Sequence, residues 1–310
     1  MKKISHFLSV SLVLALSVTL AQASLLVYEG FSYTLDDDTA ITGQATNATG
    51  LTGNYVADNQ NTASSNFRTT GLTFSSLFFP TTGGALQIST SGSNAVVRLG
   101  VALDTGAQTG TLWQSYLVNV QSRDEPNTQL SLITRVADQQ TAAPVAERSF
   151  QSFANGPTSD TPAIGYTSDS SASTGAALTN DTTYLVLARF TNVGSTLSAE
   201  TPGEATLWVF TEAGYDEWRT TGNSLESNLA ASATWTATHI VESGEHLFNN
   251  DRFLQFGSFS PVAGTNISGQ IDELRWGTTL EAVAIPEPAA WALVPALIAV
   301  LLIVRRRSRR

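Results

Sequence analysis

The stretch Tyr184-Leu185-Val186-Leu187-Ala188 decides the fold class. A β-strand sends successive side chains to opposite faces of its sheet, so a strand that is apolar at every position must be covered on both sides. Two antiparallel sheets stacked face to face provide such positions, and they also provide strands that are half solvated. The stretch therefore predicts a central strand of a β-sandwich.

Short runs of β-branched and aromatic residues recur along the chain, separated by Gly, Asn, Ser, Thr and Asp. This pattern is typical of an all-β sandwich, and no segment of the body shows a convincing helical period. We expect strands at residues 86–88, 95–99, 112–120, 130–136, 184–190, 207–210, 253–256 and 271–276, with weaker candidates near Leu25, Phe150 and His239.

Two stretches are interpreted differently from the rest. In residues 271–276, alternation places Asp272, Leu274 and Trp276 on one face of a half-solvated strand. The other face carries Glu273 and Arg275, which are well placed for a surface ion pair. Residues 40–67 are rich in Thr, Asn and Gly, and we expect a long surface excursion there.

The first 23 residues have the layout of a secretory signal peptide. Two lysines precede an apolar stretch over residues 4–20, and Ala21-Gln22-Ala23 supplies the small residues that a signal peptidase requires. Cleavage after Ala23 would make Ser24 the new N-terminus. We therefore expect an exported chain whose leader is removed.

The other end of the chain is apolar and then basic. Residues 289–304 carry no charge and are followed by Arg305, Arg306 and Arg307. A helix of that length measures about 24 Å, which the arginine stems and local thinning of the bilayer can match to a hydrocarbon core of ~30 Å. Because arginines beside a membrane helix stay cytoplasmic, the body would lie outside. The predicted organisation is a signal peptide (1–23), an extracytoplasmic β-sandwich (24–283) and a C-terminal segment (284–310).

The composition of the body excludes several functions. Two lysines lie in the leader, and five arginines and one glutamate lie in the tail, which leaves 9 basic and 25 acidic residues in the body. Such a charge repels phosphate, so nucleic acid is not an expected partner. The chain has no cysteine, and His239 and His246 would point to opposite faces of a strand. We expect neither disulfides nor a zinc site.

Pro286-Glu287-Pro288, followed by the apolar run and the arginines, resembles the PEP-CTERM sorting signal of Gram-negative bacteria that make exopolysaccharide. The resemblance implies that a membrane-embedded, transpeptidase-like exosortase reads the tripeptide and removes the helix. The chain would then be anchored only transiently in the inner membrane, with its body outside. Its destination would be the cell surface or the extracellular matrix.

The body resembles the laminin-G or concanavalin A-like jelly-roll domains of exported bacterial proteins. That resemblance implies an antiparallel jelly roll, a fold that lectins and glucanases share. It rests on LLVYEGFSY (25–33), TLWQSYLVNV (111–120), YLVLARFTN (184–192), ATLWVF (205–210) and GQIDELRWGTT (269–279).

A glycosidase needs two carboxyl groups about 5 to 9.5 Å apart, which on one strand requires residues two or four apart. Glu200 and Glu204 have the wider spacing, but Thr201-Pro202-Gly203 between them predicts a turn. Asp216-Glu217 and Asp272-Glu273 are adjacent pairs, which a strand would send to opposite faces. The Glu-x-Asp-x-x-Glu pattern of the related glucanases is missing. We therefore expect no catalytic residues.

Two groups are candidates for binding. Asp36-Asp37-Asp38 offers the hard oxygen ligands that Ca²⁺ prefers, but it lacks the alternating spacing of a calcium loop, and a solvated acidic loop is the favoured interpretation. Trp218 and Trp235 lie in polar stretches, where they would either stack on sugar rings or be buried beneath a loop. Trp113, Trp208 and Trp276 lie within strand patterns and are expected in the core.

These features predict a non-catalytic, lectin-like surface or matrix protein that binds extracellular polysaccharide. One alternative is a surface glycoside hydrolase or polysaccharide lyase that uses carboxylates from separate strands. A second alternative is a structural coat protein whose acidic surface keeps it soluble.

Overall fold

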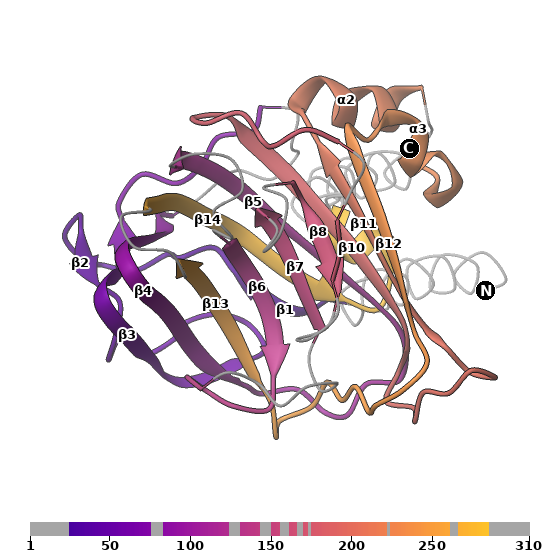
Figure 1. Ribbon diagram of the computed structural model, residues 1–310, viewed down its shortest axis with the longest axis horizontal. Coiled ribbons are helices and arrows are strands. Elements are labelled where there is room, and N and C mark those ends of the chain that lie inside the picture. The colour runs from indigo at the N-terminus through magenta and orange to yellow at the C-terminus, as the bar shows by residue number, and fades with distance from the viewer. Residues whose placement is uncertain are drawn as a thin grey trace, which may run out of the picture.

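The computed structural model describes residues 25–75, 83–123, 131–142, 150–155, 161–165, 170–172, 175–221, 224–260 and 266–284. The predicted signal peptide with Ala21 and Ala23, the Pro286-Glu287-Pro288 tripeptide and the predicted transmembrane segment lie outside these residues. Within the described part of the chain, no helix is long and apolar enough to cross a membrane. The body consists mainly of antiparallel strands, which confirms the all-β prediction (Figure 1).

The strands are β1 (Leu25–Glu29), β2 (Thr39–Ala40), β3 (Leu51–Arg68), β4 (Ala85–Leu103), β5 (Gly110–Arg123), β6 (Ser131–Ala137), β7 (Phe150–Asn155), β8 (Ala163–Gly165), β9 (Ser170–Ala172), β10 (Thr183–Val193), β11 (Gly203–Phe210), β12 (Trp235–Val241), β13 (Phe253–Ser260) and β14 (Asn266–Gly277). The helices are α2 (Glu212–Thr220), the 3₁₀ turn η1 (Glu226–Asn228), α3 (Leu229–Ser232) and α4 (Leu280–Ala284).

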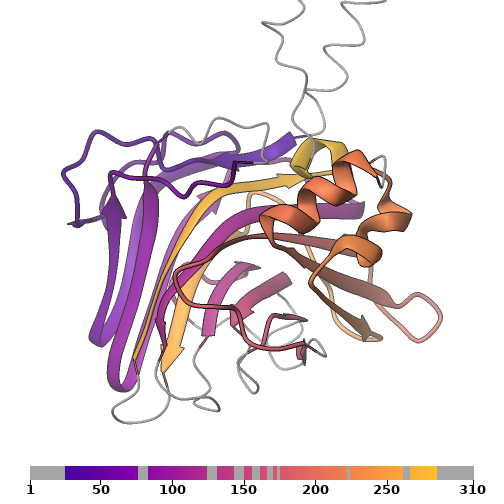
Figure 2. The same cartoon turned by 90° about the horizontal axis from the view of Figure 1, so that it is seen from above.

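The strands form one folded sheet in the order β12-β11-β10-β5-β14-β4-β13-β6-β7-β8-β9, with β1 beside β14 and β3 beside β4. The long strand β4 belongs to two layers, because residues 86–91 pair with β14 and residues 95–102 pair with β13. The sheet folds at β4 into two layers. The front layer contains β12, β11, β10, β5 and β14, and the back layer contains β13, β6, β7, β8 and β9. At the far end β8 contacts β11 and β12, so the layers enclose a core (Figure 2).

The core between the layers is lined by the inward residues of both, such as Val186, Phe256 and Trp276. The two layers are also joined by a buried polar contact, since Ser152 Oγ on β7 donates to Gln114 Oε1 on β5 at 2.8 Å. A second apolar cluster lies between the outer face of the front layer and the short helices that cover it (Figure 2).

Helix α4 is tied to this outer face. Ser115 Oγ on β5 donates to the carbonyl of Val283 at 2.6 Å, and the hydroxyl of Tyr215 donates to the carbonyl of Ala284. Strand β10 lies between the two clusters, with Leu185 facing the helices and Val186 facing the other layer. The prediction of a strand covered on both sides is therefore confirmed.

Residues 40–67 do not form the expected surface excursion. Strand β3 occupies most of that stretch and pairs with β4 from Leu51 to Arg68, with two register shifts. Its residues Tyr55 and Phe67 are buried, whereas Thr52, Asn54 and Val56 are exposed. The strand is stabilised by pairing with β4, the next strand along the chain, so its Asn- and Thr-rich composition does not reveal it.

Helix α2 also contradicts the sequence interpretation, which found no helix in the body. Thr211 caps its N-terminus by accepting from the amide of Gly214, Glu212 lies in the first turn and Arg219 in the last. Tyr215 and Trp218, three residues apart, bury one face of the helix on the front layer.

The expected alternation in residues 271–276 is broken by a bulge. Glu273 has a left-handed backbone, with φ of 52°, and the pairing with β5 shifts between Asp272 and Arg275. Leu274 and Trp276 therefore join Ile271 in the core, while Asp272 lies outside it. Because Asp272 and Glu273 are buried, the strand is not half solvated as predicted.

Candidate functional site

A row of polar side chains crosses five neighbouring strands on the outer face of the front layer. Its members are direct cross-strand partners: Asn66 on β3 pairs with Gln87 on β4, and Gln87 pairs with Gln270 on β14. Gln270 pairs with Asn119 on β5, which pairs with Thr183 on β10. We call these five residues the amide row.

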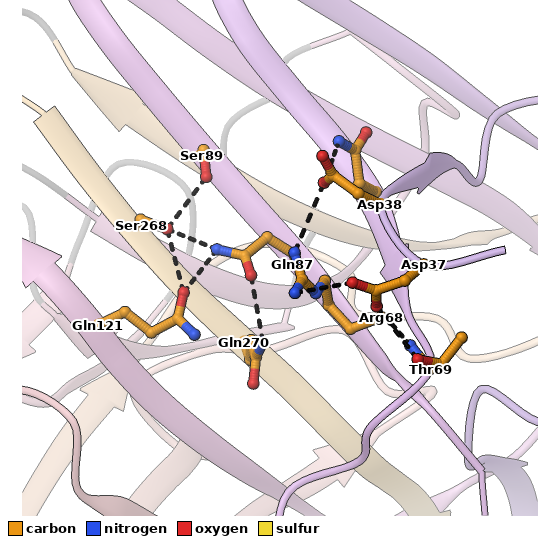
Figure 3. A network of polar contacts seen from close by, with 10 residues as sticks. Asp37, Asp38, Arg68, Thr69, Gln87, Ser89, Gln121, Ser268 and Gln270 are labelled. Atoms are coloured by element: carbon orange, nitrogen blue, oxygen red, sulfur yellow. Dashed lines mark hydrogen bonds and ion pairs between the residues drawn. The ribbon is translucent and has the colours of Figure 1, made fainter.

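Three residues next to the row extend it in the direction of the strands. The side-chain amide of Gln87 donates to Gln121 Oε1 at 2.6 Å and to Ser268 Oγ at 2.5 Å (Figure 3). Gln270 Nε2 donates to Gln87 Oε1 at 3.1 Å, and Ser268 Oγ lies 3.0 Å from Ser89 Oγ. The amide row together with Ser89, Gln121 and Ser268 is called the polar face below.

Alternation along each strand explains why the polar face exists. Leu86, Ile88, Val118, Val120 and Ile271 each adjoin a polar-face residue in the chain, and all of them point into the core. Every member of the polar face is only half buried. Amides and hydroxyls both donate and accept hydrogen bonds, and their mutual bonds fix the orientations of several of them. The face can therefore present an ordered, uncharged array to a hydroxyl-rich ligand.

Charged residues lie at one margin of the polar face. Arg68 forms ion pairs with Asp37 at 2.9 Å and with Asp38 at 3.7 Å, and Asp38 Oδ1 accepts from the amide of Asn66 at 2.9 Å (Figure 3). The backbone N–H of Thr69 donates to Asp37 Oδ1 at 2.9 Å. That hydrogen bond, and then the charge of Arg68, lower the pKa of Asp37.

The calcium hypothesis gains no support from this arrangement. The guanidinium of Arg68 already acts as the counter-ion of Asp37 and Asp38, and the side chain of Asp36 is exposed. Among the described residues, no group of three or more His, Cys, Asp or Glu side chains is arranged to hold a metal ion. The Asp36–Asp38 loop therefore does not fit a calcium site.

Neither tryptophan proposed for sugar stacking reaches the surface. Trp218 is fully buried beside Phe210 and Tyr215, and its indole N–H donates to the carbonyl of Leu225 at 2.9 Å. Trp235 is 8% exposed and packs edge-on against Tyr184. The stacking interpretation is wrong for both residues, because Trp218 is buried between α2 and the front layer, and Trp235 lies in the core between the two layers.

Glu29 is one of the three carboxylates that are buried among the described residues. It accepts from the backbone N–H of Phe31 at 2.6 Å, from Tyr33 OH at 2.7 Å and from Tyr55 OH. Burial raises its pKa, although these hydrogen bonds act in the opposite direction. The contacts join β1 to β3, so Glu29 has a structural role.

Asp272 and Glu273 complete this acidic group. Asp272 accepts from the backbone N–H groups of Leu72 at 2.9 Å and of Glu273 at 2.7 Å. Burial, and next the charge of Glu273, raise the pKa of Asp272 to about 8. Glu273 accepts from Tyr28 OH at 3.1 Å and pairs with Arg275 at 3.6 Å. The ion pair predicted for the surface therefore exists, but it is buried.

The structure brings no predicted carboxylate pair together in an open groove. Glu204 pairs with Arg189, and a bend at residues 199–201 precedes it and contains Glu200. Asp216 and Glu217 lie on α2 rather than on a strand. The buried carboxylates are held by backbone N–H groups, tyrosines and Arg275. Glu204 and Glu226 are partly exposed, but the guanidinium of Arg189 forms ion pairs with both of them.

The polar face was missed by the sequence interpretation, although a signal for it was present. Gln87 separates Leu86 from Ile88, and Asn119 separates Val118 from Val120, so single polar residues alternate with apolar ones. This alternation shows which residues point outward, but strand order is needed to place them in one row. That order depends on long-range pairing.

Comparisons with known proteins give only distant structural similarities. No protein-family model and no curated protein matches the chain. Solved structures similar to it include a peanut lectin, with 10% identity over 73% of this chain and 98% of the lectin, at a TM-score of 0.37. The lectin UEA-II complexed with galactose has 8% identity over 83% and 98% of the two chains, at a TM-score of 0.41.

An alginate lyase in complex with an alginate tetrasaccharide is also similar, with 12% identity over 63% of this chain and 81% of the lyase, at a TM-score of 0.31. These TM-scores and identities are low. The architecture of the chain therefore rests on the strand pairing described above, and its function has to be argued from its own residues.

Proposed function

We propose that this chain is an exported, PEP-CTERM-sorted protein of the cell surface or extracellular matrix, and that its concanavalin A-like sandwich binds glycan without cleaving it. The observation that carries the binding proposal is the amide row, in which residues from five strands present hydrogen-bonding groups on one outer face. Sugar hydroxyls both donate and accept, which matches the chemistry of these side chains.

The uncharged character of the polar face indicates a neutral glycan. Its eight members are amides and hydroxyls, and at its margin Arg68 neutralises only one of the two negative charges of Asp37 and Asp38. The body carries a large excess of acidic residues, which would repel an extended acidic polymer from this face. We therefore propose a neutral polysaccharide as the ligand.

The burial of three carboxyl groups supports the proposal that the protein does not cleave glycan. Glu29, Asp272 and Glu273 are buried and accept hydrogen bonds from the protein itself. A general acid has to reach the glycosidic oxygen of its substrate, and these groups are covered. The same observation disfavours the glycoside hydrolase and lyase alternative.

A binding experiment tests the proposal on the full-length protein in detergent. A glycan array and co-sedimentation with insoluble neutral polysaccharides, with and without Ca²⁺, should show retention that the double variant Gln87→Ala/Gln270→Ala loses. The matched control Thr236→Ala/Thr238→Ala changes two exposed residues of β12 and should retain binding. Absence of retention by the unmodified protein would refute glycan binding and leave the structural coat protein as the better account.

Export and sorting are tested separately by mass spectrometry of both ends of the mature protein. We expect a start at Ser24, after cleavage by signal peptidase, and loss of the terminal arginines after processing by an exosortase-type enzyme. Replacing Glu287 with Gln should leave the tail intact. An intact Arg310 on the cell-surface form of the unmodified protein would show that the anchor is permanent.

A further inference from the structure

A second polar row crosses the outer face of the back layer, away from the polar face. Gln255 on β13 is the direct partner of Arg135 on β6, and Arg135 is the partner of Gln151 on β7. Each lies next in the chain to an inward residue: Leu254 and Val136 belong to the core, and Ser152 bonds Gln114 inside the sandwich. The three side chains therefore share the outward face.

These side chains are buried although they point away from the core. The exposed fractions are 1% for Gln255, 9% for Arg135 and 3% for Gln151. Residues 138–142 cover part of the row, since Gln255 Nε2 donates to the carbonyls of Gln139 and of Ala142. A buried guanidinium in such a place needs a counter-charge, because burial of an unpaired ion is costly.

The protein does not supply that counter-charge within its described residues. Arg135 Nε donates to Gln255 Oε1 at 2.8 Å, and no ion pair joins Arg135 to a carboxylate there. The charge of Arg98, which acts on it, has the same sign: burial first, and then this charge, lower the pKa of Arg135 to about 10. Arg98 itself is paired with Asp58 at 3.1 Å.

The geometry of the row fits an anion with two oxygens. Gln255 is fixed by its two bonds to residues 138–142, and its Oε1 holds Arg135 through Nε. Within the described part of the chain, the two terminal amino groups of the guanidinium are left for another partner. A guanidinium binds a carboxylate through two parallel N–H donors, and the neighbouring Gln151 amide can add a third.

We propose that Arg135, Gln255 and Gln151 form a binding site for a carboxylate group, of the kind that a uronic acid residue or a small organic acid carries. This site is separate from the polar face and does not depend on the function proposed for that face. It gives one local cationic position to a body that is otherwise strongly acidic.

Thermal unfolding of the full-length protein in detergent tests the site with defined probes. Glucuronate and acetate should each raise the melting temperature of the unmodified protein in a saturable manner, whereas glucose at equal concentration should not. A response to glucuronate and acetate alike identifies the carboxylate alone as the ligand, and a response confined to glucuronate adds the sugar ring. Sulfate acting without glucuronate or acetate would overturn the carboxylate assignment.

Variants distinguish a binding role of Arg135 from a structural one. Arg135→Gln should weaken glucuronate binding at least about tenfold, because a hydrogen bond to a charged group is lost. Its melting temperature without ligand should equal or exceed that of the unmodified protein, since an unpaired buried charge has been removed. Arg219→Gln on α2 is the control and should bind normally. If Arg135→Gln does not fold, the melting temperature of the unmodified protein at increasing ligand concentration still tests the site. A melting temperature that neither glucuronate nor acetate changes would overturn the proposal.

Discussion

The backbone N–H of Leu72 donates to Oδ2 of Asp272 at 2.9 Å and so joins two positions 200 residues apart in the chain. The approach is close: a Cβ atom on the neighbouring Gly71 would lie 2.8 Å from the same oxygen. Residues 71–72 and strand β14 are therefore held together by a buried carboxyl group. That carboxyl group makes the stability of the fold depend on pH.

Stability should fall as the pH rises from about 4 to about 8. The folded state raises the pKa of Asp272 from 3.8 to about 8, so in this window it binds a proton that the unfolded chain has released. One such proton changes the free energy of unfolding by at most about 1.4 kcal/mol per pH unit. Glu29, whose pKa is also raised, acts in the same direction.

The variant Asp272→Asn isolates this effect in urea unfolding experiments at several pH values. Its slope against pH should be shallower than that of the unmodified protein, because the group no longer titrates. It should also be less stable at pH 5 by about 1–3 kcal/mol, since its NH₂ group replaces one of the two acceptors. Asp251→Asn, at an exposed residue, should keep the original slope. Equal slopes in both variants would contradict the assignment.

Arg189 makes cation–π contacts with two tryptophans of the front layer. Its guanidinium lies 5.9 and 5.8 Å from the ring centres of Trp113 and Trp208, which stack on each other, and it pairs with Glu204 and Glu226. Arg189→Ala should lower the free energy of unfolding by about 1–3 kcal/mol. Acrylamide should quench the fluorescence of Trp113 and Trp208 more strongly in this variant than in the unmodified protein, because the substitution uncovers their rings. Arg189→Lys should give an intermediate value. Unchanged quenching would show that Arg189 does not shield the rings.

Gly84 should tolerate no side chain. A Cβ atom there would lie 1.9 Å from the carbonyl oxygen of Arg68 and 2.4 Å from the ring of Phe67. Gly84→Ala should therefore cost at least about 1–3 kcal/mol of stability, because backbone has to move. At Gly106 a Cβ would meet nothing within 4 Å, so Gly106→Ala should be neutral or slightly stabilising. Chemical denaturation of the two variants side by side measures the difference.

Binding at the polar face should be insensitive to salt. Hydrogen bonds between amides and hydroxyls carry no net charge, so added NaCl has no ionic attraction to screen. Retention on a neutral polysaccharide should therefore be equal at low and high NaCl concentration. A loss of retention at high salt would indicate that charged residues bind the polysaccharide, and would assign the site to Arg68, Asp37 and Asp38 instead.

The parts of the fold that were predicted correctly are those in which one strand carries the whole signal. Residues 184–188 are apolar on both faces, and any covered strand needs that pattern. Strand β3 was missed because its residues match those of a loop, and only pairing with β4 makes it a strand. Helix α2 was missed because it is short, although Thr211, Glu212 and Arg219 mark its ends.

The site was less predictable than the fold, for a related reason. Alternation in residues 271–276 failed at Glu273, whose left-handed backbone no residue-type pattern foretells. The amide row requires the order β3-β4-β14-β5-β10, which mixes early and late parts of the chain. Trp218 and Trp235 have polar neighbours in sequence, but neighbours in space bury them.

The bonds from Ser115 and Tyr215 to the last residues of α4 have a mechanical consequence. They fix the position of Ala284 on the front layer, and a single residue separates Ala284 from Pro286. If the residues that follow are anchored in a bilayer, as we propose, the membrane would lie on the side of the front layer that holds α4. Removal of the tail, if it occurs as proposed, would release the polar face from this constraint on its surroundings.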